Sequence, residues 1–294
     1  MKEAYGYLLI AVASIIWGTM GIFGELAFTY GINPPTLISL RLLISALTLL
    51  VPIALFRKEL FKIQRRDLPK FLIFGIVATA LQRVTYFYAV DLTTVTMAAM
   101  LFFTYPIFVT IFASISFKEK ITPTTIFAII LTFSGNALVI KAYETSWLDA
   151  NLSGIIFGIL SSVFFVFYFL ITKELRNSYT NWTLLLYGET IGAIALTPII
   201  FSSFSAIIDY PQQLWLLIFI IAWFPNLLAY LLYSYALKHV KYSKGSILAV
   251  LEPISAAILS ATILTERFEP PQILGIILAL TGVILLFYKP KIKN

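Results

Sequence analysis

Charged side chains inside long apolar runs are the first sign of chemistry in this 294-residue chain: Glu25, Arg41, Arg83, Glu189 and Glu252. A charge among apolar residues is costly, so it marks an ion pair or a site. At a helical rise of about 1.5 Å per residue, Arg83, Glu189 and Glu252 lie deep in their runs. Glu25 and Arg41 lie nearer the ends of theirs, where a structural pair or a snorkelling Arg41 is one interpretation and an outer gate or ligand contact is the other.

The three deep charges allow two interpretations. A lone buried charge is strongly destabilising, so Arg83 could form a static pair with a glutamate and hold helices together. Alternatively, Arg83 receives a ligand carboxylate or phosphate through paired hydrogen bonds. Glu189 or Glu252 would then receive an ammonium group or a proton.

Aromatic residues make up 16% of the chain, and most of them must pack in the core or face the surroundings. Six lie within the apolar runs, away from their ends: Trp17, Tyr86, Tyr105, Tyr168, Trp223 and Tyr230. Each could pack in the core or line a cavity. Together they favour an amphipathic organic solute over a bare ion.

Two prolines, Pro106 and Pro253, lie in the middle of apolar runs. Each removes a backbone donor and bends its helix. Tyr105 and Glu252 immediately precede these bends. The alternatives are a packing kink and a hinge whose freed carbonyl groups line a pathway.

The elements that must position these residues are membrane-spanning helices. Apolar residues make up 60% of the chain, charged residues 12%, and the mean hydropathy is +0.93. A run of 18 or more apolar residues can cross a bilayer of about 30 Å. Ten such runs are predicted, near 5–28, 35–56, 69–90, 94–116, 122–141, 152–172, 182–204, 213–236, 243–264 and 270–288. The predicted fold is therefore an all-α polytopic membrane protein with no soluble domain.

The second half of the sequence repeats the first at an offset of 147 residues. Matching pairs at this offset are Tyr88 and Tyr235, Leu101 and Leu248, Pro106 and Pro253, Glu119 and Glu266, and Gly135 and Gly282. We therefore predict two repeats, 1–147 and 148–294, of five spans each. Because five is odd, the repeats must be inverted across the membrane, which allows them to exchange conformations around a shared site.

Orientation follows from the lysines and arginines, which favour cytoplasmic loops. With the N-terminus inside, only Lys141 and Arg267 fall in outer loops, and Arg41 and Arg83 lie within spans. All other cations are then on the inner side. Both termini are predicted to be cytoplasmic, in the cell membrane.

Several motifs resemble the drug/metabolite transporter superfamily, in particular its ten-helix type built from two EamA repeats. They are Trp17–Gly18–Thr19, Arg41–Leu42–Leu43 with Ala46, the run 229–237, Leu251–Glu252–Pro253, Thr265–Glu266–Arg267 and the stretch 275–286. The resemblance covers nearly the whole chain and implies that the fifth and tenth spans are peripheral. The repeats differ at two equivalent positions, where the first has Tyr105 and Arg83 and the second has Glu252 and Tyr230. Because these differences could alter the substrate, the resemblance does not identify one.

The sequence lacks the residues that other classes of function would require. The chain has no cysteine and a single histidine, in a loop, and it contains no H-E-x-x-H, P-loop or paired-Asp motif. We therefore expect no enzyme, cofactor, metal site or nucleic-acid partner. The expected partners are the lipid bilayer, a small-molecule substrate and protons, with the chain acting as a monomer or a homodimer.

The sequence as a whole favours a secondary transporter of small organic metabolites that works by alternating access. Amino acids or related zwitterions are the preferred substrates because acidic and basic groups both occur at depth, and export is the expected direction. The alternatives are a sugar-phosphate or nucleotide-sugar exchanger and a multidrug efflux carrier, with a channel as the other class.

Overall fold

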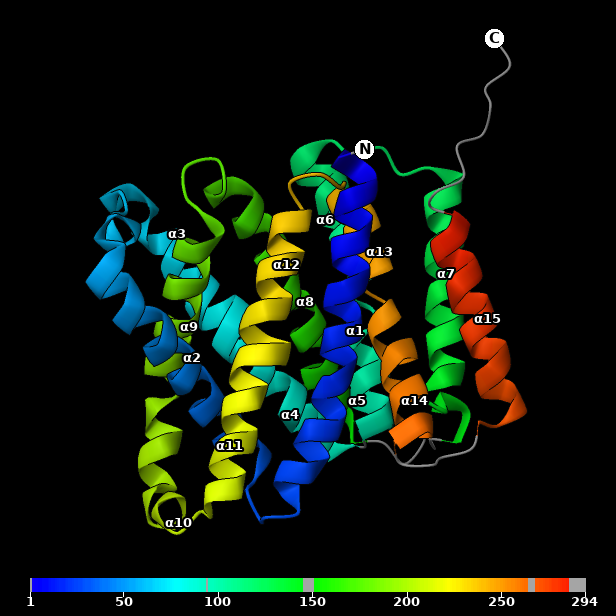
Figure 1. The fold of residues 1–294 in the computed structure, drawn as a ribbon. Helices are drawn as coiled ribbons and strands as arrows, with labels where there is room; N and C mark the ends of the chain where they lie inside the picture. The colour runs from blue at the N-terminus through cyan, green and yellow to red at the C-terminus, as the bar shows by residue number, and fades with distance from the viewer. Residues whose placement is uncertain (1, 94, 145–150, 264–267, 286–294) are drawn as a thin grey trace.

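The structure is a computed structural model that describes residues 2–93, 95–144, 151–263 and 268–285. Within these ranges every regular element is a helix, which confirms the all-α prediction (Figure 1). Seven described helices are long and apolar enough to cross a membrane, and Pro123–Val139 and Pro270–Leu285 are shorter apolar helices. Many large apolar side chains are exposed on the helices, as a lipid-facing surface requires; Leu47, Val51, Leu55, Ile115 and Ile194 are examples.

The first repeat comprises α1 (Lys2–Phe28), α2 (Pro34–Phe56), α3 (Leu68–Ile73), η3 (Phe74–Leu81), α4 (Gln82–Leu92), α5 (Val95–Phe102), α6 (Tyr105–Phe117) and α7 (Pro123–Val139). Short 3₁₀ turns at Lys58–Phe61, Arg65–Asp67 and Ala142–Glu144 lie in its loops. The second repeat comprises α8 (Leu152–Leu175), α9 (Asn181–Ser202), α10 (Phe204–Ile208), α11 (Gln212–Ile221), η5 (Ala222–Leu228), α12 (Ala229–Ala236), α13 (Tyr242–Leu248), α14 (Leu251–Ile263) and α15 (Pro270–Leu285).

Helix starts follow the local sequence. The side chain of Asn33 accepts a hydrogen bond from the backbone of Thr36 at 2.9 Å and so caps α2, whose first residue is Pro34. Thr122 caps α7 in the same way, and Pro123 follows it. A polar cap followed by proline satisfies an end donor and presets the first helical turn.

The two repeats share their irregularities. The spans α3–η3–α4 and α11–η5–α12 both contain a π-helical turn, at residues 74–81 and 222–228. The fourth and ninth spans are both interrupted, at 103–104 between α5 and α6 and at 249–250 between α13 and α14. Both interruptions directly precede the mid-span prolines. The 147-residue offset in the sequence therefore recurs in the backbone.

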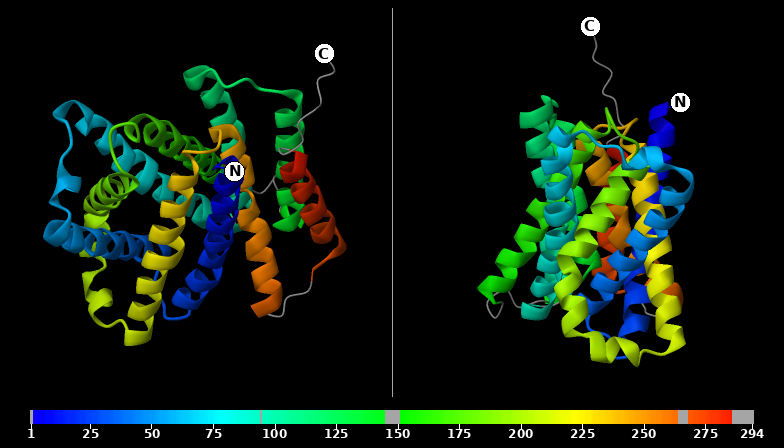
Figure 2. Two further views of the ribbon diagram at one scale, coloured as in Figure 1. Left: turned by 45° about the horizontal axis from the view of Figure 1, so that its top comes forward. Right: turned by 90° about the vertical axis from the view of Figure 1, so that its left-hand side faces the viewer.

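Helices α7 and α15 stand side by side at one edge of the molecule, as the resemblance implied (Figures 1 and 2). A Cβ atom on Gly135 would lie 2.5 Å from the backbone nitrogen of Ala279. A Cβ atom on Gly275 would lie 2.5 Å from the carbonyl oxygen of Gly135. Glycine at these positions lets the two backbones approach closely, as small residues commonly do between membrane helices.

Gly135→Ala should therefore lower the thermal stability of the protein in detergent, because overpacking a close contact costs about 1–3 kcal/mol. Gly24→Ala is the matched control, since the nearest atom to its added Cβ would be 4.0 Å away, on Phe28. Samples of both variants are heated to a series of temperatures, and the folded fraction that remains is measured by size-exclusion chromatography. The two unfolding temperatures are then compared. Equal temperatures for the two variants would contradict the role of Gly135.

Candidate functional site

A cavity of about 1150 Å³ lies between the two repeats. Eight residues singled out from the sequence line its wall: Trp17, Arg41, Arg83, Tyr86, Tyr105, Tyr230, Glu252 and Pro253. They come from α1, α2, α4, α6, α12 and α14, and so from both repeats. The cavity is therefore a shared chamber that helices from both halves of the chain enclose.

The cavity extends to one face of the molecule. Its wall includes Phe28 at the end of α1, Pro34 at the start of α2, Lys141 beyond α7 and Gln272 near the start of α15. These helix ends lie together at the bottom of Figure 1, on what we call the α1–α2 face. The opposite face, which carries the N-terminus, is called the N-terminal face.

An aromatic block separates the cavity from the N-terminal face. The ring of Tyr105, 1% exposed, lies 5.0 Å from that of Phe165 and 6.2 Å from that of Phe169. The Phe169 ring in turn lies 6.0 Å from that of Tyr233. Tyr168 is buried in the same block, against Phe165, and does not line the chamber. The chamber is therefore closed on this side.

Polar contacts between helices lie beyond the aromatic block, one of them between the two repeats and one within the second repeat. The carboxylate of Glu119 accepts a hydrogen bond from Ser243 Oγ at 2.8 Å and from the backbone nitrogens of Tyr242 and Ser243 at 3.3 and 3.4 Å. Arg176 donates to the carbonyl oxygens of Ser234 and Leu237 at 2.9 and 2.8 Å. Glu119 thus caps the start of α13, across the repeat boundary, and Arg176 ties α8 to the end of α12.

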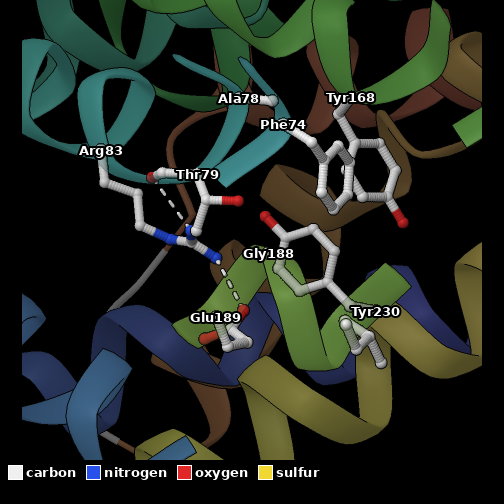
Figure 3. A pocket seen from close by; sticks show the side chains of 9 residues that line it. Phe74, Ala78, Thr79, Arg83, Tyr168, Gly188, Glu189 and Tyr230 are labelled. Atoms are coloured by element: carbon white, nitrogen blue, oxygen red, sulfur yellow. Dashed lines mark hydrogen bonds and ion pairs between the residues drawn. The ribbon is translucent and has the colours of Figure 1, made fainter. Parts of the chain in front are cut away.

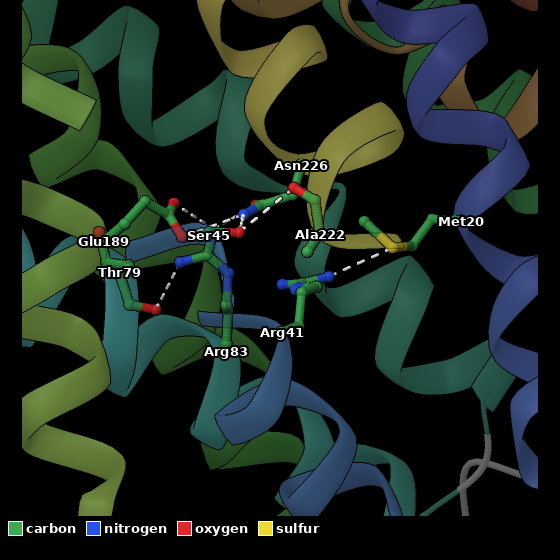
Figure 4. Close-up of polar contacts among 8 residues, drawn as sticks. All are labelled: Met20, Arg41, Ser45, Thr79, Arg83, Glu189, Ala222 and Asn226. Carbon is green, nitrogen blue, oxygen red and sulfur yellow. Dashed lines mark hydrogen bonds and ion pairs between the residues drawn. The ribbon is translucent and has the colours of Figure 1, made fainter. Parts of the chain in front are cut away.

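Arg83 lies in a buried polar cluster of five residues, which we call the arginine cluster: Ser45, Thr79, Arg83, Glu189 and Asn226. Arg83 donates to the Thr79 carbonyl at 3.0 Å and to Asn226 Oδ1 at 3.1 Å, and its Nη2 lies 3.7 Å from Glu189 Oε1. Asn226 Nδ2 donates to Glu189 Oε2 at 3.0 Å and to Ser45 Oγ at 2.9 Å. Figure 4 shows this closed network, in which Arg83 is neutralised and held at both terminal nitrogens.

The arginine cluster lies where the two repeats mirror each other. Thr79 and Asn226 occupy equivalent positions at the 147-residue offset, each in a π-helical turn, and Arg83 is equivalent to Tyr230. The guanidinium carbon of Arg83 lies 5.5 Å from the centre of the Tyr230 ring. In Figure 3, Tyr230 separates Arg83 and Glu189 from the stacked rings of Phe74 and Tyr168. Irregular turns of this kind are frequent at functional sites in membrane and soluble helices.

Arg41 lies beside the arginine cluster but is not part of it (Figure 4). Its side chain is 8% exposed and donates to Met20 Sδ at 3.2 Å, while its Nε has no hydrogen-bond partner. No carboxylate of the described side chains pairs with it. The side chain of Glu25, the partner considered from the sequence, lies outside the described residues.

Glu252 faces the chamber from α14. Within the described part of the chain its carboxylate takes part in no hydrogen bond or ion pair, although its backbone carbonyl accepts from Ser255 Oγ at 2.8 Å. Arg41 and Glu252 are therefore two opposite charges, one from each repeat, that the described residues leave unneutralised on the chamber wall.

The cation at the mouth of the chamber is neutralised. Lys141 Nζ lies 2.6 Å from Glu269 Oε1, and the hydroxyl of Tyr143 donates to the other oxygen of Glu269 at 2.9 Å. The hydrogen bond from Lys141, supported by that from Tyr143, holds the pKa of the Glu269 carboxyl below its usual range. Lys141 is thus committed to the contact between the ends of α7 and α15.

Other predicted residues lie away from the chamber wall. Trp223 is 48% exposed on the apolar surface and stacks on Phe219 at 6.0 Å. Glu189 is 3% exposed within the arginine cluster, and Pro106 is buried behind Tyr105.

Sequence reasoning missed Asn226, Ser45 and Thr79, because it followed charges and not neutral polar groups. The repeat alignment holds a signal for Asn226, which is a polar residue in an apolar span opposite another polar residue, Thr79.

The all-helical membrane fold, with its chamber between two repeats, is that of a polytopic membrane transporter. The family model for the EamA-like transporter family matches residues 4–141 and again 152–288, and this chain belongs to that family. The two matches also account for the repeat, since each covers one set of five spans.

Relatives of full length carry transporter names. The chain is 28% identical to an uncharacterized transporter of Archaeoglobus fulgidus, over 96% of both chains. It is 26% identical to one of Clostridium kluyveri, over 98% of this chain and 95% of the other. It is 23% identical to the inner membrane transporter YicL of Salmonella typhimurium, over 96% and 94%. One crystal structure of a protein with 13% identity shares the fold, with a TM-score of 0.77 over 95% of this chain and 97% of that one.

The arginine cluster predicts a coupled effect on stability. Glu189→Gln should lower the free energy of unfolding by about 3–5 kcal/mol, because it leaves Arg83 buried without its countercharge. Adding Arg83→Met should restore part of this loss, since the unpaired charge is then gone. Unfolding of the single and double variants in detergent would check the coupling.

Lys70→Met is the control for this cycle, because Lys70 pairs with Asp67 and Glu174 and with no residue of the arginine cluster. Losses from Glu189→Gln and Arg83→Met that simply add in the double variant would show that the pair is not coupled.

Proposed function

We propose that this protein is a secondary transporter that carries amino acids or related zwitterions across the membrane by alternating access. The observation that carries the proposal is the pair of unneutralised opposite charges, Arg41 and Glu252, on the wall of one aromatic-lined chamber. A zwitterion supplies both countercharges in one molecule. Its binding would therefore neutralise both side chains without leaving a net charge in the membrane.

Each wall residue has a role that its chemistry suits. Arg41 can donate to both oxygens of a carboxylate, because its guanidinium is a planar fork. Glu252 can accept an ammonium group, or a proton when no substrate is present. The rings of Trp17, Tyr86 and Tyr230 offer apolar faces to the rest of the solute.

The arginine cluster argues against the phosphorylated alternatives. A sugar phosphate or nucleotide sugar carries more than one negative charge, and Arg83, which the sequence offered as its receptor, is already bound to Glu189 and Asn226. Arg41 alone would then face a multiply charged anion in a chamber whose wall also carries the acidic Glu252. Amphipathic drugs, in turn, do not call for two opposite charges.

The closed end of the chamber supports alternating access over a channel. The chamber reaches the α1–α2 face and ends at the aromatic block, so it is open on one side only. The distribution of lysine and arginine favours cytoplasmic termini, and with that orientation the chamber would open to the outside. Such a carrier works in either direction, and export is the net direction we propose for cells that hold the substrate at the higher concentration.

The charges predict how binding changes with ligand and side chain. A panel of common amino acids is screened by thermal shift, and the best binder is compared with its decarboxylated amine and its deaminated acid by calorimetry. Arg41→Gln should weaken the amino acid about 10-fold to 100-fold and leave the amine unchanged, because a hydrogen bond to a charged group contributes about 1.5–3 kcal/mol. Glu252→Gln should weaken the amino acid and the amine but not the acid.

Trp223→Phe is the control, since Trp223 lies outside the chamber and its replacement should leave all three affinities unchanged. Wild-type protein that binds sugar phosphates and no amino acid would overturn the zwitterion assignment in favour of the exchanger. Counterflow of the bound amino acid into proteoliposomes tests transport itself, and conductance without saturation would indicate a channel.

A further inference from the structure

The loop that joins α2 to α3, residues 57–67, is fixed to the second repeat on the N-terminal face (Figure 1). Leu60 is 7% exposed and packs in a cluster with apolar residues of α2 and α9. The backbone nitrogen of Gln64 donates to the Tyr179 hydroxyl at 2.9 Å, and this hydroxyl donates to Asp67 Oδ2 at 2.8 Å. Because Tyr179 directly precedes α9, the loop is held against the start of that helix.

Six cations lie on this loop and the first turn of α3, and acidic side chains neutralise two of them. Arg57 pairs with Glu59, and Lys70 pairs with Asp67 and Glu174. The other four, which we call the loop cations, are exposed and take part in no hydrogen bond or ion pair within the described part of the chain: Lys58, Lys62, Arg65 and Arg66. The loop therefore presents uncompensated positive charge to its surroundings.

The second repeat has no such charge at the equivalent place. Its segment 204–214, which is 147 residues further on, lies on the α1–α2 face and contains no lysine or arginine (Figure 1). The connection between the second and third spans of a repeat therefore does not need cations in order to fold. The loop cations are thus available to a partner outside the chain, at one face of the membrane only.

Exposed apolar side chains adjoin the loop at both of its ends. Leu55 and Phe56, at the end of α2, are 66% and 79% exposed, and Leu68 and Leu72 of α3 are 43% and 41% exposed. They belong to the lipid-facing surface of the spans. A molecule that reaches both the loop cations and these side chains must join an anionic group to an apolar chain.

We infer that the loop cations bind the phosphate group of an anionic phospholipid in the leaflet on the N-terminal face, while its acyl chains lie along the exposed side chains at the ends of α2 and α3. Clusters of about four to eight cations directly beside a membrane helix are typical of contacts with anionic lipids. Arginine suits a phosphate group because its planar guanidinium can donate two hydrogen bonds to it. The inference depends neither on the transported solute nor on the chamber.

Membrane insertion also favours lysine and arginine in cytoplasmic loops, but it responds to their number and not to their arrangement. A lipid site requires the cations to be held together, as the contacts of this loop hold them. Removing the same number of cations elsewhere on the N-terminal face therefore distinguishes the two explanations. Four exposed cations in the loops before α7 and α13 serve this purpose: Lys118, Lys120, Lys238 and Lys241.

A bound lipid would also stabilise the packing around the arginine cluster. Helix α2 carries Ser45 and α9 carries Glu189, and the loop packs against both helices through Leu60. A ligand that binds the folded protein and not the unfolded chain raises the unfolding temperature. Anionic lipid should therefore make the whole protein more resistant to heat.

Binding is measured by native mass spectrometry of the protein in a neutral detergent, titrated with phosphatidylglycerol or with phosphatidylcholine. We expect the wild type to bind phosphatidylglycerol more tightly. A loop variant combines Lys58→Gln, Lys62→Gln, Arg65→Gln and Arg66→Gln. It should bind phosphatidylglycerol about 10-fold to 100-fold more weakly, because four cations near an anionic group act together, and phosphatidylcholine with unchanged affinity.

The control variant combines Lys118→Gln, Lys120→Gln, Lys238→Gln and Lys241→Gln. It removes the same charge from the same face and should leave both lipid affinities unchanged. Phosphatidylglycerol should raise the unfolding temperature of the wild type and of the control, but not that of the loop variant. If the loop variant does not insert, Lys62→Gln with Arg66→Gln replaces it, since this pair keeps the other two loop cations.

Three outcomes would overturn the site. Equal losses in the loop variant and the control would show that the total charge of the face attracts the lipid. Equal affinity of the wild type for the two lipids would show that the loop cations bind no lipid phosphate. Glycerol 3-phosphate, which has the phosphate group but no acyl chain, should bind much more weakly than the lipid, and binding of equal strength would identify a soluble phosphate ester as the occupant.

Discussion

The neutralisation of Arg83 at membrane depth is the constraint on which the rest of the site depends. An arginine buried in lipid must be paired, and Glu189 and Asn226 satisfy it from two helices of the second repeat. Asn226 also bonds Ser45, so one amide joins α2, α4 and α9 around η5. Because this network is closed within itself, the charges that the described side chains leave for a ligand on the chamber wall are those of Arg41 and Glu252.

The two repeats share their backbone and differ in their chemistry. The π-helical turns at 74–81 and 222–228 and the breaks before Pro106 and Pro253 recur at equivalent positions. Irregular backbone is tolerated inside a membrane only where protein or a wet cavity satisfies its polar groups. Side chains at equivalent positions are not constrained in this way, so Glu252 can stand opposite Tyr105. The repeats can therefore share their backbone irregularities while the charges within the spans differ between them.

The sequence predicted the all-helical membrane fold and the repeat, because apolar length and an offset of 147 residues are local signals. It could not predict which faces of the spans meet. The spans are apolar on all sides, so the spacing of their apolar residues does not single out one face of the helix. Arg41 was therefore considered only as a partner of Glu25 or as a gate, and its place beside the arginine cluster was not foreseen. Trp223 lies in a π-helical turn, which rotates side chains relative to the usual helical period, and it faces outward. Glu119 lies just before α7 in the sequence but caps α13, since only packing brings α13 to it.

The closure toward the N-terminal face is built from opposing contributions. Aromatic packing around Tyr105 and Phe169 favours it, and so do the bonds of Glu119 and Arg176. The unsatisfied hydroxyl groups of Tyr233 and Thr172 oppose it. A ligand can shift a conformational equilibrium only by its difference in affinity for the two states, so the proposed alternating access would require two states within a few kcal/mol of each other. A closure that was fully satisfied would hold the carrier in one state, whereas one that carries its own unfavourable contacts can be opened by a solute of modest affinity.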